Sequence, residues 1–268
     1  MKYVKGNILL IANKVDGAIG GLHMRLVNYE KNDEIIRGIY MDEMIYSMDD
    51  PGTFEMHDDV KVTVPTLPTK IICVGMNYPK HASEMNYEVP SEPVIFIKPN
   101  SSMIMSGQPI VWPKQSENVQ FEGELGVVIG NFCKDVSESE ALKFVLGYCV
   151  VNDVTARDLQ KMDGQWLNAK GFDTFLPISS WIQTDVNYRE CELISKVNGS
   201  VRQKSKLSEM IFSVEEVIAY LSSIMTLLPG DLICMGTPAG DKRLNVGDRV
   251  EIEITGIGKV SNLVVKYK

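Results

Sequence analysis

The sequence lacks the features that mark membrane, secreted and nucleic-acid-binding proteins. No apolar run approaches the roughly 18 residues that suggest a membrane-spanning helix, and the apolar stretch within Met1–Lys14 is too short for a signal peptide. Positive charge is in deficit, because 27 Lys and Arg stand against 35 Asp and Glu and give a net charge of −8. That charge disfavours nucleic acid and anionic membranes as partners. The composition therefore predicts a globular protein of the cytoplasm.

Cysteine and histidine are also scarce. The five cysteines are scattered and form no C-x-x-C pair. Most lie in apolar runs, which is typical of small buried residues in a reducing compartment and argues against a zinc site. Of the three histidines, His23 and His57 fall outside any catalytic spacing. His81 is therefore the candidate imidazole base.

Strand and turn signals divide the chain into two parts. Asn7–Ala12 and Glu34–Tyr40 are short runs typical of strands. Val64–Pro68 then carries two prolines, which remove backbone donors and disfavour regular pairing. We therefore predict a small β-rich domain at residues 1–66 and a larger main domain at residues 67–268. Capping boxes predict two helices in the main domain, from Ser137 to about Leu146 and from Ser213 to about Met225.

The main chemical signal is a pair of carboxylates in one strand. The run 120–130, QFEGELGVVIG, is predicted to be a single buried strand, in which the alternation of side chains places Glu122 and Glu124 on the same face. Neighbouring carboxylates repel each other, and a hard divalent cation bound by both would remove the repulsion. A third carboxylate, Asp153, ends another apolar run. These three residues, here called the acidic triad, are the candidate metal ligands. A solvated strand face is the alternative, and we assign the second Glu-x-Glu, at residues 251–253, to it.

A candidate base lies closer to the N-terminus. Pro79 suits the first turn of a helix, in which His81 and Glu84 would be i and i+3 neighbours on one face. A carboxylate beside an imidazole fixes its tautomer and raises its basicity, as a general base requires. The alternative is a solvated helical turn with an incidental ion pair.

Helical spacing groups three further side chains. Asp153, Arg157 and Gln160 would share one face if a helix began at Asp153. A carboxylate, a guanidinium and an amide in this order suit a metal ion at one end and an organic anion at the other. An aspartate N-cap with an i, i+4 ion pair is the structural alternative.

Two more candidates follow later in the chain. Lys170 stands among the aromatic residues of the run 166–175, where its ammonium group is placed to stabilise an anion or an enolate. The Gly236–Pro238 turn follows a buried strand and offers backbone N–H groups and the Thr237 hydroxyl to a carboxylate. A surface lysine beside core phenylalanines and an ordinary strand-end turn are the structural alternatives.

Six segments, taken together and in order, resemble the short bacterial and archaeal members of the fumarylacetoacetate hydrolase superfamily. The similarity runs from about Lys70 to Asn262, which is most of the chain. The segments are Val74–Tyr78, His81–Glu84, Phe121–Leu125, Asn152–Asp158, Ala169–Asp173 and Gly236–Pro238. Each segment alone is a weak signal, whereas the ordered set indicates the superfamily without indicating the substrate.

This resemblance implies a fold, a cofactor and a site. The fold is α+β and mostly β, with a core of rolled and sandwiched sheets beside the small N-terminal domain, and the protein is usually a homodimer. The acidic triad would hold Mg²⁺ or Mn²⁺. The remaining roles implied are a base on a mobile lid segment for His81 with Glu84, a catalytic role for Lys170, and substrate contacts for Arg157, Gln160 and Thr237.

We therefore predict a divalent-metal-dependent enzyme acting on a 2-oxo acid. In the favoured reaction an acylpyruvate chelates the metal, an enolate forms at C3, and water activated by His81 and Glu84 leads to cleavage of a C–C bond and release of pyruvate. The same enolate would serve a decarboxylase or isomerase of oxaloacetate or a hydroxymuconate-type diacid, or a dehydratase of a 2-keto-3-deoxy sugar acid. A non-catalytic metal-binding protein is the remaining alternative, and it gives no role to His81, Glu84 and Lys170.

Overall fold

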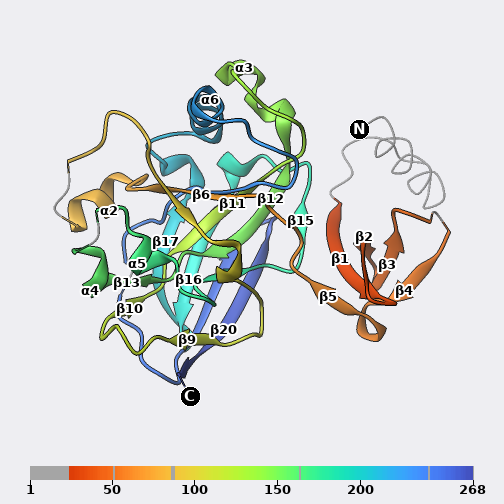
Figure 1. The fold of residues 1–268 in the computed structure, drawn as a ribbon, viewed down its shortest axis with the longest axis horizontal. Helices are drawn as coiled ribbons and strands as arrows, with labels where there is room; N and C mark the ends of the chain where they lie inside the picture. The colour runs from red at the N-terminus through yellow and green to blue at the C-terminus, as the bar shows by residue number, and fades with distance from the viewer. Residues whose placement is uncertain (1–23, 51, 86–87, 163, 241, 268) are drawn as a thin grey trace.

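The computed structural model describes residues 24–50, 52–85, 88–162, 164–240 and 242–267. Within these residues strands dominate and form a 13-stranded sheet, a 5-stranded sheet and a 2-stranded ribbon. Figure 1 shows the main body with the N-terminal strands at one side. The predicted α+β, mostly β fold is thus confirmed. The strand predicted at Asn7–Ala12 lies outside the described residues.

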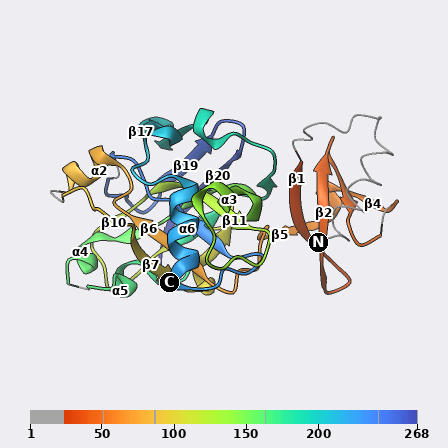
Figure 2. The ribbon, with the colours of Figure 1, turned by 90° about the horizontal axis from the view of Figure 1, so that it is seen from above.

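The N-terminal strands extend the large sheet. They are β1 (Arg25–Lys31), β2 (Glu34–Met41), β3 (Met44–Ser47), β4 (Phe54–Met56) and β5 (Lys61–Thr63). Strand β1 pairs antiparallel with β15, Arg25 opposite Gln183 and Leu26 opposite Ile182. The connection at residues 64–68 has neither helix nor strand, in keeping with its prolines. In Figure 2 these strands form a separate lobe beside the main body, and the domain boundary at residues 66 and 67 stays a prediction.

The other strands of the large sheet surround β11 and β12. They are β6 (Ile71–Gly75), β7 (Val94–Lys98), β8 (Met103–Met105), β11 (Gly123–Ile129), β12 (Val145–Asn152), β14 (Leu176–Ile178), β15 (Ile182–Gln183) and β18 (Leu232–Cys234). The main path through the described part of the sheet is β4-β3-β2-β1-β15-β12-β11-β18-β6-β7. Strand β11 therefore lies between β12 and β18 and has no free edge.

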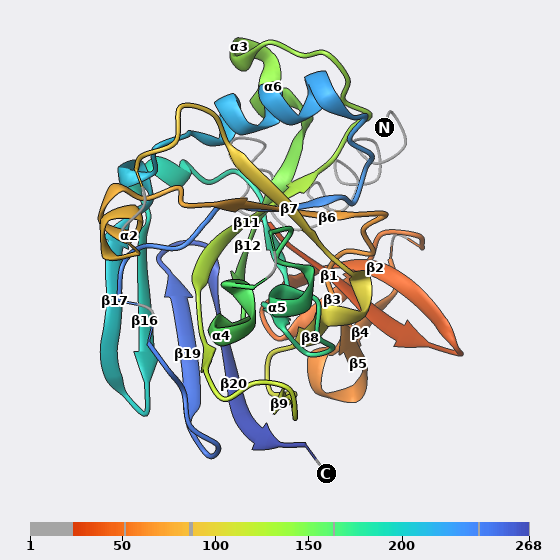
Figure 3. The ribbon, with the colours of Figure 1, turned by 60° about the vertical axis from the view of Figure 1, so that its left-hand side comes forward.

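The second sheet and the helices complete the main body. The sheet contains β9 (Ile110–Trp112), β16 (Glu192–Val197), β17 (Ser200–Lys206), β19 (Arg249–Ile254) and β20 (Gly258–Lys266), and the ribbon pairs β10 (Val119–Gln120) with β13 (Thr155–Ala156). The α-helices are α2 (Pro79–Glu84), α3 (Glu138–Ala141), α4 (Arg157–Gln160), α5 (Leu167–Lys170) and α6 (Val214–Ile224). Figure 3 shows α3 and α6 together at one end of the molecule and α4 beside α5. None of the described helices is long and apolar enough to cross a membrane.

Every residue of β11 is buried. Leu125, Val127 and Ile129 belong to the core cluster that also contains Ile252 of the second sheet. Val128 faces a different cluster on the other side of the strand. This confirms the prediction of a strand with apolar neighbours on both faces, so the carboxylates at its start are carried into the interior.

Three predicted elements differ from the structure. The strand expected over 120–130 is interrupted, because the Glu122 N–H donates to the Asn152 side chain (2.9 Å) instead of to a strand ladder. The helix expected from Ser137 to about Leu146 is shorter and lacks a side-chain cap at Ser137: α3 ends at Ala141, a 3-10 turn follows at Leu142–Phe144, and β12 begins at Val145 to pair with β11. No helix begins at Asp153: residues 155–156 are extended and pair with β10, and α4 starts only at Arg157. The capping box at Ser213 is confirmed.

Asp231 links the starts of two neighbouring parallel strands, and its replacement by asparagine should destabilise the protein. The buried carboxylate accepts hydrogen bonds from Leu228 N (2.7 Å) and Thr69 Oγ1 (2.7 Å) and pairs with Lys70. Burial alone would raise the pKa of Asp231, but Lys70 and the N–H donors lower it below its ordinary value. The carboxylate therefore contributes stability that is complete above the unfolded-chain pKa of about 3.9 and is lost as the pH falls below it.

For Asp231→Asn we expect a loss of about 1.5–3 kcal/mol at pH 7, the range for hydrogen bonds to a charged group. Urea unfolding measures this loss. Asp58→Asn is the control, because the Asp58 side chain is 98% exposed and its replacement should change the free energy of unfolding by less than about 0.5 kcal/mol. Equal effects of the two substitutions would contradict the role given to Asp231.

Candidate metal and substrate site

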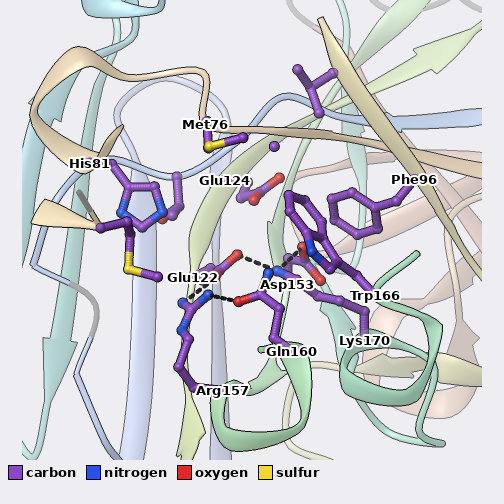
Figure 4. Close-up of a pocket in the computed structure, with 14 residues that line it drawn as sticks. Met76, His81, Phe96, Glu122, Glu124, Asp153, Arg157, Gln160, Trp166 and Lys170 are labelled. Carbon is purple, nitrogen blue, oxygen red and sulfur yellow. Dashed lines mark hydrogen bonds and ion pairs between the residues drawn. The ribbon is translucent and has the colours of Figure 1, made fainter. Parts of the chain in front are cut away.

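The acidic triad converges at the joined ends of β11 and β12. These strands are antiparallel, with Gly123 opposite Asn152, and the Asp153 N–H donates to the Glu122 carbonyl (2.8 Å). The strand pairing thus brings the third carboxylate to the first two. One oxygen from each lies within 4.8 Å of the others, and all three residues are buried. Figure 4 shows their side chains around one pocket.

Three buried cations lie against two members of the acidic triad, Glu122 and Asp153. Lys170 Nζ lies 2.6 Å from Glu122 Oε2 and 2.7 Å from Asp153 Oδ2. Lys98 Nζ lies 2.6 Å from the other Asp153 oxygen, and Arg157 pairs with Glu122 through its guanidinium group. The cations equal the triad carboxylates in number, so the side chains carry no excess of negative charge before a metal ion binds, although none of these ion pairs reaches Glu124.

The three carboxylates are not equivalent. Burial disfavours ionisation of Glu122, but the charges of Lys170 and Arg157 outweigh it and hold its pKa well below the ordinary value. Burial and the negative charges of Asp153 and Glu122 raise the pKa of Glu124 far above the ordinary value. The hydrogen bond that Glu124 accepts from Gly236 N (2.9 Å) only partly compensates. Conversely, the neighbouring carboxylates raise the pKa of Lys170 despite its burial.

This donor set fits a hard divalent cation. Oxygen ligands roughly 2.0–2.6 Å from one ion lie up to about 5 Å from each other, which agrees with the separation within the acidic triad. Such an ion would also compensate the charge of Glu124, whose pKa is raised by burial and by repulsion from Asp153 and Glu122. The ion would leave the site with an excess of positive charge, because the side chains already balance. The site is therefore suited to a cation together with an anionic organic ligand.

Aromatic and sulfur-containing side chains close the rest of the pocket. The cavity is small, about 30 Å³, enough for an ion or one or two waters. Trp166 stands edge-on to Phe96, with 5.2 Å between ring centroids. A Cβ on Gly75 would lie 2.6 Å from the Trp166 ring, so glycine is needed for this approach. Met76 and Trp166 both line the pocket with left-handed backbone, φ 55° and 63°, an uncommon conformation that is concentrated at functional sites.

Most of the residues predicted for the site line this pocket. They are His81, Glu122, Glu124, Asp153, Arg157, Gln160, Lys170 and Thr237. Glu84 does not line it: its side chain is exposed, and its carboxylate accepts a hydrogen bond from Gly240 N (3.0 Å). Arg157 and Gln160 are paired through Nη1 and Oε1 (2.6 Å). Asp153 lies in the same pocket because it directly follows β12. It does not share a helical face with Arg157 and Gln160, as the spacing suggested. The roles of all these residues stay predictions.

Sequence reasoning missed two buried polar residues beside the site. Lys98 is the last residue of an apolar strand, and a lysine inside such a run was the available signal. Gln203 lies in β17 among polar residues and gave no signal. It donates from Nε2 to Thr237 Oγ1 (2.8 Å). Both contacts depend on strands that are distant in sequence.

The fold and this pocket define a class of protein: a β-rich domain with an interior oxygen-ligand site for a divalent cation beside buried groups suited to an organic anion. Residues 70–265 match the model of the family described as fumarylacetoacetate (FAA) hydrolase C-terminal. The chain belongs to this family, as its six segments predicted, and it is an enzyme.

Several relatives carry an activity in their names. A mitochondrial oxaloacetate tautomerase of Arabidopsis thaliana is 46% identical over 198 residues, 72% of this chain and 89% of that protein. A 2-hydroxyhepta-2,4-diene-1,7-dioate isomerase from Mycobacterium marinum has TM-score 0.83 and 41% identity and covers 91% of this chain and 98% of that chain. A fumarylpyruvate hydrolase from Pseudomonas aeruginosa, solved with Mn²⁺ and pyruvate, has TM-score 0.72 and 33% identity over 76% and 92% of the two chains.

Proposed function

We propose that this enzyme acts on a small 2-oxo acid by forming an enolate at C3, with a divalent cation, Mg²⁺ or Mn²⁺, on the acidic triad. The observation that carries the proposal is the convergence of three buried carboxylates beside the buried cations Lys98, Lys170 and Arg157. A bound divalent cation would polarise the carboxylate and 2-oxo oxygens of the substrate and so stabilise an enolate at C3. Its two positive charges are balanced by an anionic substrate.

The chain's own groups supply the rest of the chemistry. Lys170 is buried and its pKa is raised, so it stays protonated and presents a fixed positive charge to a developing enolate. Arg157 lies on the pocket wall near Glu122 and can orient a carboxylate of the substrate. His81 is buried on α2 and lines the same pocket, where its imidazole can accept or return a proton. Trp166 and Phe96 limit the access of water to C3.

The overall reaction proposed is hydrolysis of an acylpyruvate. His81 takes a proton from water, the hydroxide oxygen adds to C4, and the C3–C4 bond breaks. The products are a carboxylate from the acyl group and pyruvate, whose C3 receives a proton. The similarity to a fumarylpyruvate hydrolase that was solved with Mn²⁺ and pyruvate supports this reaction.

A second candidate is enolisation or decarboxylation of oxaloacetate, which needs proton transfer at C3 but no attacking water. One observation favours it: Glu84, the proposed partner of His81 in activating water, bonds to Gly240 outside the pocket lining. The similarity to an oxaloacetate tautomerase agrees with a compact C4 diacid.

Parallel assays separate these candidates. We expect wild-type turnover of an acylpyruvate that is abolished by EDTA and restored by Mn²⁺ or Mg²⁺. His81→Ala should lower kcat by about 10²–10⁴, the usual contribution of a general base, while Mn²⁺ affinity is unchanged. His57→Ala is the control, because His57 lies at the N-terminal strands with its side chain 41% exposed.

Each outcome has a distinct meaning. Turnover that survives EDTA contradicts the whole proposal. Hydrolysis by His81→Ala at the wild-type rate contradicts the role of this base, and metal-dependent turnover of oxaloacetate alone favours the second candidate. The homodimer and the cytoplasmic location that the sequence indicates stay predictions.

A further inference from the structure

Gln203 is a buried glutamine that lies outside the pocket but contacts two segments carrying it. It projects from β17, which belongs to the second sheet, and is 1% exposed. Its Oε1 accepts hydrogen bonds from Ser195 Oγ (2.7 Å) and Gly123 N (3.1 Å). Its Nε2 donates to Thr237 Oγ1 (2.8 Å) and to the Pro238 carbonyl (2.7 Å). Both donor positions and both acceptor positions of the amide are therefore used.

The first contacted segment is the one that carries two of the triad carboxylates. Gly123 lies between Glu122 and Glu124, and its N–H is held by Gln203. A Cβ at Gly123 would lie 2.4 Å from Ser195 Oγ and 3.1 Å from Gln203 Oε1. Glycine at this position thus lets the second sheet approach the backbone of the ligand segment. The orientation of Glu122 and Glu124 depends on this backbone.

The second contacted segment is the turn that holds the carboxylate of Glu124. Gly236 N donates to Glu124 Oε2 (2.9 Å), and Gly236 has φ +88°, so the turn needs glycine. Thr237 Oγ1 donates to the Gly123 carbonyl (2.9 Å) while accepting from Gln203. Gln203 therefore closes a network that joins the turn to the ligand segment.

We propose that Gln203 is a positioning residue for the cation site, acting through Gly123 and through the Gly236–Pro238 turn. It does not itself line the pocket, although it holds Thr237 of the pocket wall, and it touches none of the ligand oxygens. Its amide holds the backbone at Gly123, next to Glu124 in the chain, and at the turn that binds the Glu124 carboxylate. Glu122 and Glu124 are thereby held in place before a cation binds. The expected effect on cation affinity rests on the proposed function. The expected effect on the backbone rests only on the hydrogen bonds of the structure.

The test compares Gln203→Leu with the wild type in two measurements. Leucine is similar in size and forms none of the four hydrogen bonds. We expect Mn²⁺ affinity, measured by electron paramagnetic resonance, to fall about 10–100-fold, as for other groups that orient metal ligands. In the metal-free protein, amide exchange should become at least about tenfold faster at Gly123 and Gly236, because their hydrogen bonds lose support.

Two further variants make the result specific. Gln183→Leu is the matched control: Gln183 is also buried and donates to the backbone carbonyls of Met24 and Thr184, and none of these three residues lines the pocket. It should lower the melting temperature without changing Mn²⁺ affinity. Thr237→Val combined with Gln203→Leu should weaken Mn²⁺ binding by less than the product of the single effects, since both act through one network.

Two results would overturn the role proposed for Gln203. A folded Gln203→Leu variant with wild-type Mn²⁺ affinity and wild-type exchange at Gly236 overturns the proposal. If that variant does not fold, Ser195→Ala removes only the hydroxyl that orients Gln203, and unchanged affinity and exchange in it overturn the proposal as well. A wild-type protein that fails to bind Mn²⁺ contradicts the proposed function, and the exchange of Gly236 still decides the role of Gln203.

Discussion

Glu124→Gln is expected to abolish cation binding while leaving the metal-free protein as stable as the wild type or more stable. Glu124 is the member of the acidic triad whose pKa is raised, by burial and by the charges of Asp153 and Glu122. Its ionised form therefore costs stability at every pH above the unfolded-chain pKa of about 4.3. Glutamine removes the charge and keeps an oxygen that can accept from Gly236 N. The substitution therefore removes the stability cost of burying this charge and, at the same time, one anionic ligand of the cation.

Mn²⁺ titration and thermal unfolding of the metal-free protein measure the two effects. Mn²⁺ affinity should fall on the order of 100-fold or more, because ligand charge and number set the affinity of such sites. Glu122→Gln is the matched control, since it also removes a ligand charge but breaks the pairs with Lys170 and Arg157. It should cost about 3–5 kcal/mol of stability. A drop in metal-free melting temperature as large for Glu124→Gln as for Glu122→Gln would contradict this assignment of the charges.

Lys170→Met is expected to lower kcat strongly without weakening cation binding. Lys170 Nζ bridges Glu122 Oε2 and Asp153 Oδ2, so its charge competes with a cation for the same oxygens. Removing the ammonium group leaves the ligands in place and removes the group that would stabilise an enolate. We expect kcat to fall about 10²–10³-fold, the usual effect of losing one such electrostatic contact.

Stability gives a second readout for Lys170→Met. Loss of the lysine leaves buried carboxylates uncompensated, at a cost of about 3–5 kcal/mol in the metal-free protein. Mn²⁺ should then raise the melting temperature more than it does for the wild type, because binding neutralises the same carboxylates. Lys70→Met is the control, since Lys70 pairs with buried Asp231 outside the pocket; it should lower stability and leave kcat unchanged. Activity of Lys170→Met within a few-fold of the wild type would exclude a catalytic role for this lysine.

The fold was predictable because its strongest signals are local. The buried strand predicted before the Gly236–Pro238 turn is β18, and the strand face predicted at residues 251–253 belongs to β19, whose Glu251 and Glu253 are exposed as expected. The capping box at Ser213 predicted α6 to within one residue of its end. The helix expected after Ser137 forms but is shorter than predicted, because β12 begins at Val145 to pair with β11.

The sequence predicted which residues form the candidate site, but not which of them contact one another. The Glu-x-Glu spacing and the carboxylate at a strand end name three residues, and repulsion between like charges suggests a cation for them. Lys98, in contrast, meets Asp153 across 55 positions, and no periodicity reports such a distance. Glu84 illustrates the opposite case, since its spacing to His81 suggested a pair, whereas its carboxylate bonds to Gly240.

The sequence by itself determined the family, the strand-rich fold and the acidic triad, because side-chain alternation and short ordered motifs survive in one dimension. Only the tertiary structure decided the charge balance of the pocket, the inequality of the three carboxylates and the part played by Gln203. Those properties depend on burial and on contacts between strands far apart in the chain. A pKa or a hydrogen-bond network is set by what surrounds a group in space, and the packing of two sheets supplies those surroundings.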